Sequence, residues 1–261
     1  SGVPSVDIVH STAIDSYKNL CLAGVARKDF PITENAFDTV YGETGKLFIT
    51  KLNEKGNDLV FSTYLGGSKT DTASGLTIDE QNNIYITGIT SSTDFPTTPN
   101  VYSNEFGSNK SCAFISKIRP DGSSLEYSTF IPDVGISEIL ADQSGSIYMT
   151  GSISSSIFGN VNIISTQQMD DVFLSAEILV AKLNTSGSDM EFITIISGEN
   201  EETGTDLALD ENQNIYICGR TKSEIFPTTN NAFEKTSNNT STSFYDVVIL
   251  KLDSSGKNLL Y

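Results

Sequence analysis

The chain has 261 residues, with 16 Lys and Arg against 33 Asp and Glu, one His, three Cys and a formal net charge of -17. This charge disfavours nucleic acid and anionic membrane surfaces as partners, because proteins bind phosphates largely through Lys and Arg. The single His10 excludes any triad, zinc cluster or proton relay that needs two imidazoles, and no apolar run is long enough to span a membrane.

An internal repeat runs through the chain. An Asp recurs at intervals of 64, 63 and 68 residues, and each Asp is followed nine positions later by a Gly. The repeated Asp residues are Asp15, Asp79, Asp142 and Asp210. A second set, Lys51, Lys117, Lys182 and Lys251, ends an apolar run in each copy, with a Gly five positions further on. The sequence therefore contains four repeats of about 65 residues.

In chain order, the copies are expected at about 6–67, 68–131, 132–198 and 199–261. In the second copy, runs at 73–78, 84–90, 113–118 and 125–131 predict four short strands joined by turn-forming residues. Apolar runs such as Val247–Leu250 predict sheets covered on both faces. Small antiparallel sheets that repeat and pack face to face predict an all-β chain, a single β-propeller domain over 1–261 built from four-stranded blades.

A Phe-Pro pair recurs in the long link between the second and third strands. It appears at Phe30, Phe95 and Phe226, while the third copy has Phe158-Gly159 instead. We expect these aromatic residues to fold back over a blade edge as an apolar plug, and exposed rings would contradict this expectation.

Several repeated segments resemble the prokaryotic β-propeller repeat family known as SBBP, which is named for an expected seven blades. The resemblance is carried by Tyr64–Gly67, Asp79–Gly88, Asp94–Thr98 and the Lys-Leu-Asn-x-x-Gly-x-x-Leu pattern of Lys51–Leu59. It implies a propeller and a secreted or surface protein, often a large one, rather than a defined activity. Seven such blades need about 455 residues, so either four blades form the ring or the chain is a fragment. The third copy departs most from the pattern and is expected to be a reshaped blade.

The repeated charged residues allow a functional and a structural interpretation. A ring of Asp15, Asp79, Asp142 and Asp210 around the propeller axis is a candidate metal site, but Asp at the start of a hairpin turn is the more common role. For the repeated Lys residues we expect a buried stem below a solvated ammonium, with a carboxylate of the neighbouring blade as a secondary partner. Repetition favours structure, because an active site needs only one copy.

Functional differences are expected where the copies differ. The segments unique to one copy are Ile163–Phe173, Glu199–Glu202 and Ser237–Ser243, and binding sites usually lie in such loops. N-glycosylation motifs of the form Asn-x-Ser/Thr begin at Asn109, Asn184, Asn238 and Asn239. Cys21 and Cys218 occupy second strands in the first and fourth copies. The sequence allows either a disulfide between them or free thiols, and buried free thiols are the more common case.

The leading hypothesis is a non-enzymatic extracellular or cell-surface module that displays loops to a protein or glycan, within a larger adhesin, filament or envelope assembly. It predicts no catalytic residues and no cofactor. Two alternatives remain: a structural subunit, a homo-oligomer or polymer, that assembles through the unfinished strand at Tyr261, and a glycosidase or lyase that uses a pair of carboxylates.

Overall fold

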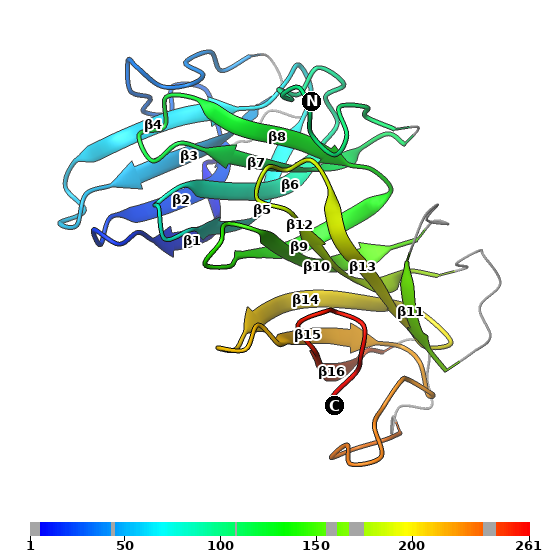
Figure 1. The fold of residues 1–261 in the computed structure, drawn as a ribbon. Helices are drawn as coiled ribbons and strands as arrows, with labels where there is room; N and C mark the ends of the chain where they lie inside the picture. The colour runs from blue at the N-terminus through cyan, green and yellow to red at the C-terminus, as the bar shows by residue number, and fades with distance from the viewer. Residues whose placement is uncertain (1–5, 43–44, 108, 155–160, 167–174, 237–243) are drawn as a thin grey trace. The chain divides into compact units, whose positions relative to one another are not determined.

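A computed structural model describes residues 6–42, 45–107, 109–154, 161–166, 175–236 and 244–261. Every regular element among these residues is a β-strand (Figure 1), and none of them forms a helix long and apolar enough to cross a membrane. The strands form four separate sheets, which we call blades one to four in chain order. They divide between two compact units, one built on blades one and two with the turns at 143–146 and 185–189, the other on blades three and four.

The first unit contains two four-stranded antiparallel meanders. Blade one consists of β1 (Ile8–Ile14), β2 (Leu20–Ala26), β3 (Lys46–Leu52) and β4 (Leu59–Leu65). Blade two consists of β5 (Asp71–Ile78), β6 (Ile84–Thr90), β7 (Cys112–Ile118) and β8 (Leu125–Ile131). The predicted strands of the second copy are confirmed to within two residues at each end.

The second unit departs from the four-stranded pattern in both of its blades. Blade three consists of β9 (Val134–Ala141), β10 (Ile147–Ile153), β12 (Glu177–Leu183) and β13 (Met190–Ser197), with the short β11 (Asn162–Ser165) added parallel to β13. Blade four has β14 (Glu202–Leu209), β15 (Ile215–Thr221) and β16 (Asp246–Leu252). Its fourth strand is represented by the end of the chain, where Leu259 pairs with Leu252 and the Leu260 amide donates to the Lys251 carbonyl at 2.7 Å. The chain is thus an all-β propeller of four blades, and the third is reshaped as expected.

The repeated Gly that follows each Asp by nine positions lies opposite a break in the register of the first strand. In blades one, two and three, a Cβ at this Gly would overlap a carbonyl oxygen of that strand, for example Thr72 O at Gly88. Gly is needed here because the bulged strand brings its backbone against the second strand.

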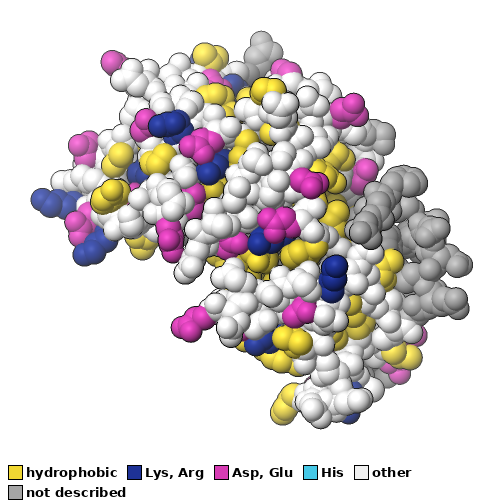
Figure 2. All heavy atoms as spheres, viewed as in Figure 1, with side chains coloured by type: hydrophobic (Ala, Val, Ile, Leu, Met, Phe, Trp, Pro, Cys, Tyr) yellow, Lys and Arg dark blue, Asp and Glu magenta, His cyan; other side chains and the backbone are white. Residues whose placement is uncertain are grey.

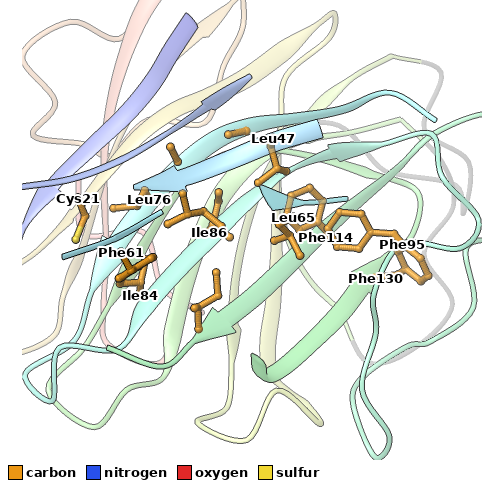
Figure 3. Packing of buried hydrophobic residues seen from close by; sticks show 14 of the residues in the cluster. Cys21, Leu47, Phe61, Leu65, Leu76, Ile84, Ile86, Phe95, Phe114 and Phe130 are labelled. Carbon is orange, nitrogen blue, oxygen red and sulfur yellow. The ribbon is translucent and has the colours of Figure 1, made fainter. Parts of the chain in front are cut away.

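The core of the first unit lies between blades one and two. Leu47 of blade one and Ile84 and Ile86 of blade two are fully buried in it (Figure 3). Ile49 of blade one is fully buried in the same core. Figure 3 also shows the ring of Phe95 beside that of Phe114, with the centroids 4.3 Å apart.

The plug prediction is confirmed for the Phe-Pro pairs of blades one, two and four. Phe95 is buried, Phe226 is buried in the core of the second unit, and Phe30 is half-buried and stacks on Phe48 at 4.2 Å. Phe158 lies outside the described residues. The links between second and third strands therefore contribute to the cores.

Candidate functional site

The repeated Asp and Lys of each blade form an ion pair with each other. The Nζ to Oδ2 distances are 3.2 Å for Lys51 and Asp15, 3.8 Å for Lys117 and Asp79, 3.3 Å for Lys182 and Asp142, and 3.2 Å for Lys251 and Asp210. The expectation of a carboxylate from the neighbouring blade was therefore wrong. The pair forms within one blade because the Asp follows the first strand and the Lys ends the third strand, on either side of the second.

Each Asp whose hydrogen bonds are described also organises its own turn, which confirms the turn interpretation. In blade two, Asp79 Oδ1 accepts from the amides of Gln81 and Asn83 at 3.0 and 2.8 Å, and Oδ2 accepts from the Asn83 side chain at 2.8 Å. Asp15 and Asp210 repeat the bonds to the residues two and four positions on. Within the described part of the chain, no three His, Cys, Asp or Glu side chains lie close enough together to hold a metal ion.

These contacts shift the pKa values of Asp15 and Lys182 so that the charged forms are favoured. Burial acts to raise the pKa of Asp15, but hydrogen bonds from Asn19 and the charge of Lys51 outweigh it and hold the pKa below its usual value. Burial likewise acts to lower the pKa of Lys182, and the Glu191, Tyr148 and Asp142 acceptors raise it above the ordinary value. Groups stabilised in their charged forms are poorly suited to general acid or base chemistry near neutral pH.

A second repeated contact joins one blade to the next. Ten positions after each Lys stands an aromatic residue, and in three blades its ring lies against a Gly in the last hairpin turn of the following blade. The pairs are Phe61 with Gly122, Tyr127 with Gly187, and Phe192 with Gly256. In each case a Cβ on the Gly would overlap the ring, and the Gly has a φ of +70° or +71°. We call this contact the ring–turn contact.

Blade four carries the aromatic half of this contact, and blade one carries the glycine half. Tyr261 follows Lys251 by ten positions, and its side chain is 43% exposed. Gly56 has the same left-handed conformation, φ +66°, but nothing lies within 4 Å of the position of a Cβ. Among the described residues, no aromatic ring lies against Gly56, and the Tyr261 ring does not lie against a turn Gly.

The sheet face of blade four beside Tyr261 is uncovered. The residues two and four positions before the repeated Lys are fully buried in the first three blades, as Leu47 and Ile49 illustrate for blade one. The equivalent Val247 and Ile249 of β16 are 78% and 61% exposed. Cys218, directly opposite Ile249 on β15, is also exposed. We call Val247, Ile249, Cys218 and Tyr261 the blade-four face.

A groove runs along this face and is walled by the link that follows the Phe-Pro pair. It has a volume of about 810 Å³, lies between the link at 226–234 and β16, and reaches Leu260 and Tyr261. Phe233 in this link is fully exposed, unlike the plug residue Phe226. A groove of this size and apolar lining is suited to an apolar side chain or ligand.

On the face shown in Figure 2, the described charged residues form no comparable site. Acidic and basic side chains are scattered over the face shown in Figure 2 rather than gathered into a patch of one sign. Glu201 pairs with Lys222 and accepts from the Tyr245 hydroxyl at 3.0 Å, so part of the acidic 199–202 segment is engaged in local contacts. This distribution fits a solubilising role for the acidic residues.

Other candidate residues fall in different places. Ile163 and its neighbours form β11, whereas 167–174 and Ser237–Ser243, with Asn238 and Asn239, lie outside the described residues. None of the three cysteines, all of which are described, is in a disulfide; Cys21 and Cys112 are buried whereas Cys218 is exposed. Burial raises the pKa of Cys21 to about 12. The prediction of buried thiols is confirmed for Cys21 and is wrong for Cys218, because the blade-four face is open.

Comparison with protein families gives two matches to one model. The model described as a beta-propeller repeat, SBBP, matches residues 60–96 and 191–227. These two segments are therefore similar to SBBP beta-propeller repeats. Each SBBP match runs from the last strand of one blade to the Phe-Pro pair of the next, so it covers the junction of blades one and two or that of blades three and four. No match covers the start of blade three, where Phe-Pro is missing.

No curated protein matches this chain, whereas 75 chains of solved structures do. The Hadza microbial sialidase Hz136 is similar with a TM-score of 0.51 at 7% identity, over 97% of this chain and 45% of the sialidase chain. A Dyadobacter fermentans protein of unknown function has a TM-score of 0.49 at 10% identity, over 98% of this chain and 69% of its own. A Xanthomonas campestris gluconolactonase has a TM-score of 0.42 at 10% identity, over 83% and 57%. This chain spans less than half of the sialidase chain, and the likeness to it shows the fold alone.

A pair of buried carboxyl groups in the second unit escaped the sequence analysis. Glu177 at the start of β12 and Glu202 at the start of β14 are 3% and 0% exposed, and the proximity of Glu202 adds to burial in raising the pKa of Glu177. The equivalent positions in the first unit hold Lys46 and Asp71, whose charges attract. Comparing the copies position by position would have revealed the replacement of a basic residue by an acidic one.

Proposed function

We propose that the chain is a non-enzymatic, extracellular or cell-surface interaction module that binds a protein through the blade-four face. The observation that supports this most strongly is the exposure of Val247 and Ile249, at positions that are fully buried in the other three blades. Exposed apolar sheet surface beside an aromatic residue is typical of the centre of a protein interface.

A protein suits this surface better than a glycan, because the face consists of aliphatic and aromatic side chains with few hydrogen-bonding groups. The non-enzymatic part of the proposal is supported by the repeated Asp and Lys residues, whose charges neutralise each other in every blade. The carboxyl pair of Glu177 and Glu202 is buried and offers no open site for a sugar. For the location outside the cell, the support is the resemblance to the SBBP family, which implies a secreted or surface protein.

The accessibility of the face can be tested with the apolar dye 8-anilinonaphthalene-1-sulfonate. The folded chain is expected to bind the dye, and Ile249→Glu is expected to remove most of the binding. Val40→Glu is the matched control, because Val40 is 66% exposed on blade one and outside the groove. Equal dye binding by the wild-type and Ile249→Glu chains would show that the face is not an apolar binding surface.

A further inference from the structure

We propose that the partner of the blade-four face is the first blade of a second copy of this chain, bound head to tail. The proposal rests on the proposed function and names the protein that the face binds. The proposal is based on the junction between blades one and two inside the first unit, where one sheet packs on the next. The residues on the two sides of this junction show which residues each side of such an interface needs.

One side of that junction matches the blade-four face position by position. In blade one, Leu47, Ile49 and Phe61 lie in the core that joins blade one to blade two. Their equivalents, counted from the repeated Lys, are Val247, Ile249 and Tyr261. The blade-four face is therefore the surface with which a blade of this chain contacts its successor.

The other side of the junction matches the free surface of blade one. In blade two, Ala73 on β5 is 3% exposed in the same core, and its equivalent on β1 is Val9, which is 50% exposed. The turn that contains Gly122 receives the Phe61 ring, whereas the equivalent turn with Gly56 receives nothing. Blade one thus presents the surface by which a blade contacts its predecessor.

One polar contact of the junction, from the repeated Lys to the next blade, has no counterpart at Lys251 within the part of the chain that the structure describes. Lys51 Nζ donates to the carbonyl of Pro120 in the next blade at 3.0 Å, and its side chain is only 3% exposed. Lys251 is 18% exposed and bonds to Asp210 and the Tyr216 hydroxyl of its own blade. In the assembly, Lys251 would donate to the carbonyl of Glu54 of the second copy, because Glu54 occupies the place of Pro120.

The two surfaces differ, so the contact is heterologous: each copy uses blade four on one neighbour and blade one on the other. Repetition of such a contact gives a closed ring or an open filament rather than a symmetric dimer. The formal charge of -17 on each copy opposes assembly, so salt is expected to strengthen it by screening.

Two variants each block one of the two proposed contact surfaces, the first on blade one and the second on blade four. Gly56→Asn adds a side chain where the Tyr261 ring of the second copy would lie, and Asn tolerates the left-handed backbone at this position. Ile249→Glu places a charge on the blade-four face. Gly42→Asn is the control for the first variant, since Gly42 has φ +81° but lies in a different loop.

The experiment is sedimentation velocity of the full chain over a wide range of concentrations and at two salt concentrations. We expect the wild-type and Gly42→Asn chains to form dimers and larger species as concentration rises. Gly56→Asn and Ile249→Glu are each expected to weaken self-association by about tenfold or more. Mixed together, these two variants are expected to form a dimer and nothing larger, because each retains the surface that the other has lost.

Three outcomes would overturn the proposal: a wild-type chain that stays monomeric at every concentration, self-association that neither variant weakens, or a mixture of the two variants that does not form a dimer. The dye measurement separates this failure from a failure of the proposed function. If Ile249→Glu removes dye binding while the wild-type chain stays monomeric, the face is open but its partner is not a second copy. If dye binding is unchanged by that variant, the proposed function fails as well.

Discussion

Glu177 of blade three and Glu202 of blade four are neighbouring carboxyl groups in the second unit, and both are almost completely buried. Thr221, Ser223 and the Gly198 amide donate to Glu202. Burial, with Glu202 adding to it, raises the pKa of Glu177 to about 7. Glu177 is therefore protonated in mildly acidic solution.

This pair predicts that the second unit is more stable at mildly acidic pH. The pKa of Glu177 is higher in the folded chain than in the unfolded chain, so the folded state binds more protons between the two values. The free energy of unfolding is expected to fall as the pH rises from about 4.5 to about 7. Glu177→Gln, which keeps one hydrogen bond without a charge, is expected to be more stable than the wild-type chain at pH 8 by on the order of 1 to 3 kcal/mol.

Urea unfolding at pH 5 and pH 8 measures this difference. The exposed Glu211→Gln serves as the control and is expected to keep the wild-type difference between the two pH values. A Glu177→Gln chain that loses stability with pH as steeply as the wild-type chain would contradict the role given to the pair.

The Lys and Asp pairs predict unequal effects of the same substitution in different blades. Lys51 and Asp15 have side chains 3% and 1% exposed, whereas Lys251 and Asp210 are 18% and 26% exposed. Lys51→Met leaves a buried carboxylate unpaired and is expected to cost about 3 kcal/mol. Lys251→Met is expected to cost much less, because water and salt screen the charges of this more exposed pair. Urea unfolding of both variants tests the comparison, and equal losses would show that burial does not control the contribution of the pair.

The ring–turn contact predicts a similar contrast between two glycines. Gly56→Ala is expected to cost about 1 kcal/mol, because only the left-handed backbone is strained. Gly122→Ala carries the same strain and also overlaps the Phe61 ring, which is expected to cost about 1 to 3 kcal/mol more. Thermal unfolding of the two variants at low protein concentration, where self-association is minimal, measures the difference. A Gly56→Ala chain as unstable as Gly122→Ala would mean that the turn of blade one is already covered.

Phe95 and Phe233 both lie in links between the second and third strands of a blade, but only Phe95 packs into the core. The two residues are therefore expected to contribute differently to stability. Phe95→Ala is expected to destabilise the chain by about 3 to 5 kcal/mol, because Phe95 packs between Phe114 and Phe130. Phe233→Ala is expected to change stability by less than about 0.5 kcal/mol, since its ring is exposed. Urea unfolding checks both values. A large loss of stability in Phe233→Ala would show that this residue packs within the folded chain.

Much of the fold could be predicted from the sequence, because the repeat aligns four copies of each strand and turn. The register of Asp15, Lys51 and their equivalents is visible without a structure, but their pairing within one blade is not, since it depends on which strands lie side by side. The continuous apolar run Val247–Leu250 in β16 predicted burial on both faces. That prediction was wrong for blade four because burial depends on a neighbouring sheet, which the pattern of a single strand cannot reveal.

The reactivity of Cys218 tests most directly whether the blade-four face is open. In a dilute solution of the folded chain, Cys218 is expected to react rapidly with a thiol reagent, while Cys21 and Cys112 react only after unfolding in urea, to a total of three thiols. At high protein concentration, the reaction of Cys218 is expected to slow as the face becomes covered. If Cys218 in the dilute folded chain is protected as strongly as Cys21, the face is closed and the interaction surface described for blade four does not exist.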